Sequence, residues 1–294
     1  MKNYTIGNPL GIKPIKKLLI SFAWPAITAN IINALYSIVD QIFIGQGVGY
    51  LGNAATNIAF PITTICLALG LMIGIGAAAN FNLELGRGNS EKAKAVVGTS
   101  VSSLFIIGVI LTILIHIFLE PLMYAFGSTD EILPYAKTFA GISSLGIPFL
   151  LLSISTNPMV RSDNSPKYSM YAIVLGAVLN IILNPIFIFG FGWGIAGSAW
   201  ATVISQVLSA AILLLYFPRF KSVKFDRSDF IPKFSLLKIS IALGMTSFVF
   251  QGSNMIIQVV TNNLLNTYGS QSIYGNDIPI AVAGIVAKVN IIFV

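Results

Sequence analysis

Long apolar runs are the feature that most constrains how this chain folds. Polar turns separate seven of them, at residues 18–39, 53–80, 96–119, 133–156, 169–191, 194–217 and 239–265, and an eighth begins near Pro279 and continues to Val294. Their lengths suit the ~17 to 25 residues that a helix needs to cross a bilayer core. None alternates polar and apolar residues with a period of two, as barrel strands do. The runs therefore predict an all-α integral membrane protein with about eight transmembrane helices.

Composition supports a location in the lipid bilayer. Only 9% of the residues are charged and the mean hydropathy is +0.85, whereas soluble domains carry roughly 25% charged residues. No short apolar segment with a small-residue cleavage site precedes the first run, so we expect that run to remain in the mature protein.

Basic residues are concentrated in alternate connections between the runs. Fifteen of the 17 lysines and arginines lie before the first run or between runs two and three, four and five, and six and seven. The positive-inside rule places these connections and the N-terminus in the cytoplasm, as in a multi-pass protein of the inner (cytoplasmic) membrane. This distribution also accounts for the net charge of +7, and we predict no nucleic-acid partner.

A weak internal repeat divides the chain. "LLISFAWPAIT", near residue 18, aligns with "LLKISIALGMT", near residue 236, when Ser21 is matched to Ser240. This predicts an N-terminal six-helix lobe at 1–217, a basic cytoplasmic inter-lobe loop at 218–238, and the start of a second lobe at 239–294. Because the second unit would lack helices that the first contains, we expect the sequence to be a fragment of a longer protein, truncated in helix eight.

A carboxylate interrupts the first span, in "ANIINALYSIVDQIFIG". An ionisable residue at the centre of a membrane helix costs ~2.5 to 3.5 kcal/mol and usually faces a bundle interior or a wet cavity. Helical spacing places Asp40 on one side with four other polar residues, namely Asn30, Asn33, Tyr36 and Ser37. Two structural explanations remain open: Asp40 lies near the external helix end and reaches the interface, or the polar stripe is interhelical packing.

Three further runs carry polar side chains that could meet this stripe. In "LNIILNPIFIF", Asn180 and Asn184 share one face, and Pro185 leaves the carbonyl of Ile181 without its helical donor, which favours a kink. Stripes also follow the sixth run (Ser198, Thr202, Ser205, Ser209) and the seventh (Ser247, Gln251, Asn254, Gln258, Asn262). Close helix packing is the alternative explanation for both. Lys288, in the eighth run, has no role that the sequence defines.

Signals for enzyme chemistry are weak. The single histidine, His116, cannot form a metal cluster, and the single cysteine, Cys66, cannot form an internal disulfide. "GIGAAA" imitates a dinucleotide-binding fingerprint but follows an apolar helix instead of a strand. We therefore predict no enzyme activity and no cofactor.

Several motifs together resemble the MATE (multidrug and toxin extrusion) family, especially its DinF-like and MepA-like bacterial branch. They are "SFAWPAITANIINALYSIVDQIFIGQGVG", "LGNAATNIAFPI", "GRGNSEKA", "NPMVRSDNSPKYSM", "NIILNPIFIFGFGWGIAGSAWATVISQ" and "IAVAGIVAKVNIIF", and they cover nearly all of the chain. The resemblance implies a twelve-helix protein of two lobes, monomeric when full length, that exchanges H+ or Na+ for small organic, often cationic, drugs.

The same resemblance assigns roles to individual residues. Asp40 would be the cation-coupling carboxylate, and the cavity of the N-terminal lobe would be lined by Asn157, Asn180, Asn184 and Thr202, beside the polar face of Asn33, Tyr36 and Ser37. A sodium ion would bind at Asp40, Asn180 and Asn184. Desolvation favours the protonated form of a carboxyl group, so protons and drugs would compete for one site.

Three positions depart from the family pattern. Many relatives have an acid in place of Asn184, which weakens a sodium site and favours protons. Gln251 stands near a position where another branch carries a glutamate. Asn164 replaces a glycine, but asparagine tolerates a positive φ, so the turn is expected to survive. Two other functions remain open: a flippase for lipid-linked saccharides, and an inactive truncated product.

Overall fold

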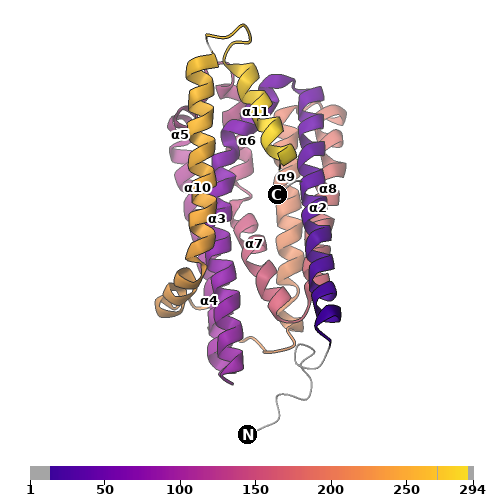
Figure 1. Cartoon of the computed structure of the whole chain (residues 1–294), viewed down its shortest axis with the longest axis vertical. Coiled ribbons are helices and arrows are strands. Elements are labelled where there is room, and N and C mark those ends of the chain that lie inside the picture. The colour runs from indigo at the N-terminus through magenta and orange to yellow at the C-terminus, as the bar shows by residue number, and fades with distance from the viewer. Residues whose placement is uncertain (1–13, 270, 291–294) are drawn as a thin grey trace.

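The chain is a bundle of long helices in a computed structural model that describes residues 14–269 and 271–290, without the side chains of residues 18 and 288–290. No strand occurs among these described residues, which confirms the predicted all-α class. The helices run along the long axis of the molecule (Figure 1). They are α2 (Ile15–Gly47), α3 (Tyr50–Gly86), α4 (Ser90–Ile117), α5 (Leu119–Ala125), α6 (Leu133–Ser144), α7 (Ile147–Ser162), α8 (Pro166–Pro185), α9 (Ile195–Leu214), α10 (Phe234–Gly269) and α11 (Asp277–Asn290).

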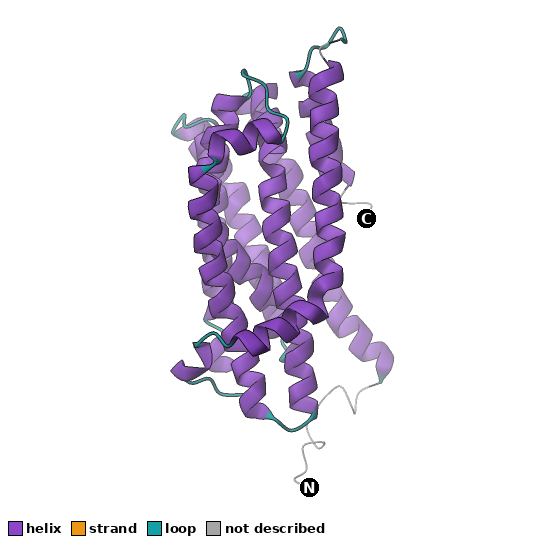
Figure 2. Ribbon diagram, turned by 90° about the vertical axis from the view of Figure 1, so that its left-hand side faces the viewer, coloured by secondary structure: helices purple, strands orange, loops and turns teal. Residues whose placement is uncertain are grey.

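The apolar runs predicted from sequence become these helices. Within the described residues, six helices are long and apolar enough to span a membrane, or seven when the bent pair α6 and α7 is taken as one span. α11 begins where the eighth run was expected, and residues 291–294 of that run lie outside the described residues. Loops gather at the two ends of the bundle, as Figure 2 shows.

The fourth predicted span, 133–156, is broken instead of continuous. α6 and α7 meet at a bend of 56°, where Gly146 precedes α7 and Pro148 lies in its first turn. Proline lacks the N–H that an uninterrupted helix would use there, so it fits a helix start. A Cβ atom at Gly108 of α4 would lie 2.6 Å from the Cα of Pro148, so the bend also depends on close packing against α4.

α3 lies at the centre of the fold and packs against α4, α7, α10 and α11. Its contact with α10 is close because both helices present glycines. A Cβ at Gly76 would collide with the carbonyl oxygen of Ser240, and a Cβ at Gly244 would collide with that of Met72. Small residues of this kind let membrane helices approach backbone to backbone.

A cluster of buried and half-buried amide side chains joins the first half of α3 to α10 and α11. Asn57 donates to Asn262 at 3.0 Å and to the carbonyl of Ile280 at 2.9 Å, and Gln258 donates to Asn57 at 2.7 Å. Gln258 and Asn262 belong to the polar stripe predicted on the seventh run. For these two residues the structure matches the packing explanation.

The connection between α9 and α10 is folded against the bundle. It contains two short 3-10 turns, η2 (Phe217–Arg219) and η3 (Arg227–Phe230). A fully buried acid, Asp163, holds its first part by accepting hydrogen bonds from the Tyr216 hydroxyl, the Lys221 N–H, and both the N–H and hydroxyl of Ser222. The connection is therefore an ordered part of the fold.

Candidate functional site

α2 carries the intramembrane carboxylate. The helix extends to Gly47, beyond the predicted end at residue 39, so Asp40 lies seven residues before the helix end, or ~10 Å along the axis at 1.5 Å per residue. Its side chain is half-buried. Asp40 is therefore within the helix, in the third of α2 that is nearest the predicted external end.

Two other helices donate hydrogen bonds to this carboxylate. The Asn184 side chain of α8 donates to Asp40 Oδ1 at 2.8 Å, and the Ser198 hydroxyl of α9 donates to the same oxygen at 2.9 Å. Hydrogen bonds to an ionised acceptor are stronger than neutral ones. Asp40 thus joins α2 to α8 and α9 through its charge.

A second layer of hydrogen bonds continues away from Asp40. Asn184 also donates to Asn180 Oδ1 at 2.9 Å, and Asn180 donates to the Thr202 hydroxyl at 3.4 Å. Asn180 and Asn184 are buried. The structure therefore brings Asp40, Asn184, Asn180 and Thr202 into one continuous polar network.

Local sequence explains how these side chains meet. Asn180 and Asn184 are one turn apart on α8, and Ser198 and Thr202 are one turn apart on α9. α8 ends at Pro185 and passes into a π-helical turn, η1 (Ile186–Gly190). Such turns occur often at functional sites. A Cβ at Gly197 would lie 2.8 Å from the carbonyl carbon of Phe187, so this glycine lets α9 approach the turn closely.

The remaining predicted residues lie elsewhere or face other partners. Tyr36 is within electrostatic range of Asp40. Ser37 donates to the backbone carbonyl of Asn33, whose own side chain is exposed. Asn157 is buried in α7 and donates to the carbonyl of Ser169 at 3.4 Å. The side chain of Lys288 lies outside the described residues. The functional roles of all these residues stay predictions.

The contact between Ser198 and Asp40 was only partly predictable from the sequence. The sequence puts it in a polar stripe with Thr202, whereas its hydroxyl donates directly to Asp40. The spacing of Ser198 and Thr202 does place Ser198 one turn nearer the start of α9 than Thr202. What the sequence does not provide is the position of α9 relative to α2.

In the arrangement described, polar side chains beside Asp40 are hydrogen-bonded to it and to one another. Among the described residues, no group of three or more His, Cys, Asp or Glu side chains could hold a metal ion. Hard cations such as Na+ instead need several oxygen ligands. The amide nitrogen of Asn184 faces Asp40, whereas its oxygen is buried without a hydrogen-bond partner within the described part of the chain.

An ionisable side chain held between membrane helices is the kind of group that marks a functional site. Residues 25–186 match the model of the MatE family, and the chain belongs to this MATE family. The resemblance noted in the sequence is thereby confirmed.

Similar proteins agree with this membership. The probable multidrug resistance protein YoeA of Bacillus subtilis is 27% identical over 265 residues, which are 85% of this chain and 56% of the relative. The multidrug export protein MepA of Staphylococcus aureus is 26% identical over 261 residues, which are 88% of this chain and 58% of the relative. The chain therefore spans somewhat more than half the length of these relatives.

Solved structures match most of this chain's fold. The MATE multidrug transporter DinF-BH, solved in a complex, has a TM-score of 0.88 and 32% identity, covering 95% of this chain and 62% of that chain. An inward-facing multidrug resistance MATE transporter of the MOP superfamily has a TM-score of 0.79 and 27% identity, with 88% and 57% covered.

Proposed function

We propose that this protein acts in secondary active multidrug efflux, exchanging a cation for organic, often cationic, compounds across the cytoplasmic membrane. The observation that carries the proposal is the Asp40 carboxylate, which lies within a membrane helix and accepts hydrogen bonds from two neighbouring helices. A group in this position can change charge and alter the contacts of three helices at once. The names of the similar proteins supply the substrate class.

We favour protons over sodium ions as the coupling cation. Asp40 Oδ1 accepts from an N–H of Asn184 and the O–H of Ser198, and Asn180 Oδ1 accepts from the same Asn184 amide. A sodium ion at Asp40, Asn180 and Asn184 would require amide oxygens to turn toward it. A proton needs only the carboxylate. Protonation weakens these hydrogen bonds and frees Asn184 and Ser198 for other partners.

The coupling ion is tested by transport in proteoliposomes containing the whole protein. Ethidium movement is followed with a pH gradient alone, and then with a sodium gradient alone at equal, clamped pH. We expect transport to respond to the pH gradient. Transport driven by sodium with no response to pH would overturn proton coupling but would leave efflux itself intact.

The membrane orientation and the division into lobes belong to the same proposal. We assign residues 1–217 to one lobe, 218–238 to a cytoplasmic connection, and 239–294 to a second lobe, in a protein that works as a monomer. The basic residues of the connection support this orientation.

Cysteine labelling tests the orientation. In a Cys66→Ser background, Lys224→Cys places a thiol at an exposed position of the connection, and Ile273→Cys places one in the opposite loop. An impermeant maleimide added to intact cells should label position 273 and not position 224. The reverse pattern would overturn the topology.

A further inference from the structure

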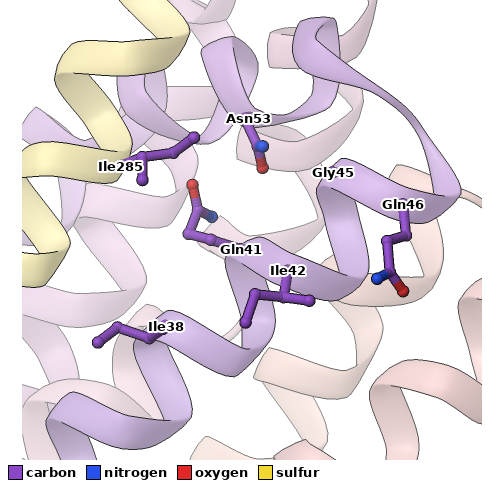
Figure 3. A pocket seen from close by; sticks show the side chains of 7 residues that line it. All are labelled: Ile38, Gln41, Ile42, Gly45, Gln46, Asn53 and Ile285. Atoms are coloured by element: carbon purple, nitrogen blue, oxygen red, sulfur yellow. The ribbon is translucent and has the colours of Figure 1, made fainter.

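A largely apolar cavity with amides in its buried wall lies beside α2, away from the Asn184 and Ser198 contacts of Asp40. Its volume is about 290 Å³, close to the ~300 Å³ lower limit of typical ligand pockets. Figure 3 shows it between α2, α3 and α11, lined by Ile38, Gln41, Ile42, Gly45, Gln46, Asn53 and Ile285. Residues 40 and 41 point ~100° apart around a helix of 3.6 residues per turn. The donors to Asp40 come from α8 and α9 instead.

The buried side of the cavity is formed by amides in fixed positions. Gln41 donates to the Thr56 hydroxyl at 3.1 Å, and Thr56 in turn donates to the backbone carbonyl of Asn53 at 2.9 Å. Both Gln41 and Asn53 are more than nine-tenths buried. These hydrogen bonds connect α2 to α3, so the wall of the cavity exists before anything binds.

Asn53 places in this wall one of six buried side-chain atoms that have no hydrogen-bond partner in the described part of the chain. Its side-chain oxygen, Oδ1, is buried and has no hydrogen-bond partner within the described residues. A buried acceptor without a donor is costly, and native structures rarely leave one unpaired. Gly45 makes room for the carboxamide, because a Cβ at residue 45 would lie 2.8 Å from Asn53 Nδ2. Neighbouring atoms cover this oxygen, so a ligand's N–H or O–H reaches it only when those side chains shift.

The outer side of the cavity is mainly apolar, with Gln46 as the one exposed polar side chain among the seven lining residues. Ile42 is 50% exposed and Ile285 is 40% exposed, and they come from α2 and α11. No charged residue is among the seven described residues that line the cavity. The site therefore lacks the carboxylate that would attract a cation, in contrast to Asp40.

We propose that this cavity binds a small, neutral, amphiphilic organic molecule with one hydrogen-bond donor. The donor pairs with Asn53 Oδ1, and the apolar part of the molecule packs between Ile42 and Ile285. This assignment concerns binding and does not depend on the coupling mechanism proposed above. It gives the protein a site for uncharged compounds that is separate from the carboxylate.

The test compares 2-naphthol, which has one O–H donor, with 2-methoxynaphthalene, which has nearly the same shape and no donor. Each is titrated by calorimetry into the whole protein in mild detergent, with the signal of empty micelles subtracted. We expect wild type to bind the naphthol roughly two- to tenfold more tightly, the range for one net hydrogen bond. Equal binding of the two compounds by wild type would overturn the proposal.

Matched variants locate the binding. Asn53→Leu should remove the preference for the naphthol, and Ile42→Trp should fill the cavity and abolish binding of both compounds. Ile27→Trp is the control, since Ile27 lies on the same helix and is 52% exposed. Binding that survives Ile42→Trp would overturn the site. Equal binding of the two compounds by wild type overturns the proposal by itself, so the proposal stays falsifiable even when a variant fails to fold.

Discussion

Two carboxylates that are withdrawn from solvent, Asp40 and Asp163, are held in different ways. Asp163 is fully buried at the end of α7 and accepts four hydrogen bonds, two of them from backbone N–H groups of the α9–α10 connection. Asp40 is half-buried within α2 and accepts from the side chains of Asn184 and Ser198 on two other helices.

The difference in donors separates a structural acid from one suited to switching. Backbone donors can leave Asp163 only if the connection itself moves, because the N–H groups of residues 221 and 222 are fixed in the chain. The Asn184 and Ser198 donors to Asp40 are side chains, which can rotate to new partners without unfolding a helix. Burial alone therefore does not distinguish the two acids in their surroundings. The kind of donor does.

The largest expected effect comes from removing the charge at Asp40. Asp40→Asn keeps the size of the side chain, so we expect normal folding and membrane insertion, but loss of cation-coupled ethidium export to background. Everted membrane vesicles measure the export, and size-exclusion profiles measure folding. Glu131→Gln, at an exposed acid outside the site, is the control and should retain export. Wild-type export by Asp40→Asn would end the assignment of Asp40.

Removal of Asp163 should affect stability more than coupling. Asp163→Ala leaves the N–H groups of Lys221 and Ser222 without their acceptor, at a cost of about 3 kcal/mol. We expect a lower melting temperature and faster proteolysis of residues 218–238. The remaining folded protein should show an unchanged pH dependence of export. Asp163→Asn, which retains one acceptor oxygen, should lie between Ala and wild type; a variant as stable as wild type would contradict the anchoring role.

Changing one donor at each acid sharpens the comparison. Asn184→Leu removes a donor to the Asp40 carboxylate, which disfavours the ionised form, so the pH profile of export should move to higher pH. Tyr36 also lies within electrostatic range of Asp40 and is left unchanged. Ser222→Ala removes one hydroxyl donor from Asp163, and should cost about 1 kcal/mol of stability.

The two profiles are measured in the same vesicles across a series of pH values. Ser222→Ala is the matched control, because it also removes a single side-chain donor to a carboxylate. A profile that moves with Ser222→Ala but not with Asn184→Leu would reverse the roles given to the two acids.

Sequence predicts one of these acids and not the other, for a physical reason. Asp40 interrupts an apolar helix, so its polar neighbours stand out at helical spacing. Asp163 lies in "RSDNSP", where an acid among polar residues carries no such signal. Its burial depends on Tyr216 and Ser222, more than fifty residues later in the chain. The break between α6 and α7 at Gly146 is likewise not predictable from the sequence, because it depends on the packing of Pro148 against Gly108 on α4.

The conformation of the residue after Asp163 was predictable. Asn164 replaces a glycine of the family pattern, and asparagine was expected to tolerate a positive φ. The structure confirms this, with φ at 57°, the one positive value for a non-glycine residue in the described part of the chain. This turn directs the chain from α7 to α8 directly beside the buried carboxylate.

The smallest expected effect follows from restoring that glycine. Asn164→Gly adopts the same φ without strain but gains freedom in the unfolded chain, so we expect stability to change by less than about 1 kcal/mol. Asn164→Val is the contrasting variant, because a β-branched residue in this conformation costs about 1–2 kcal/mol. Thermal unfolding measures both. If glycine destabilised the protein as much as valine, the Asn164 side chain itself would be needed beside Asp163, and the anchor would extend beyond the four donors to that carboxylate.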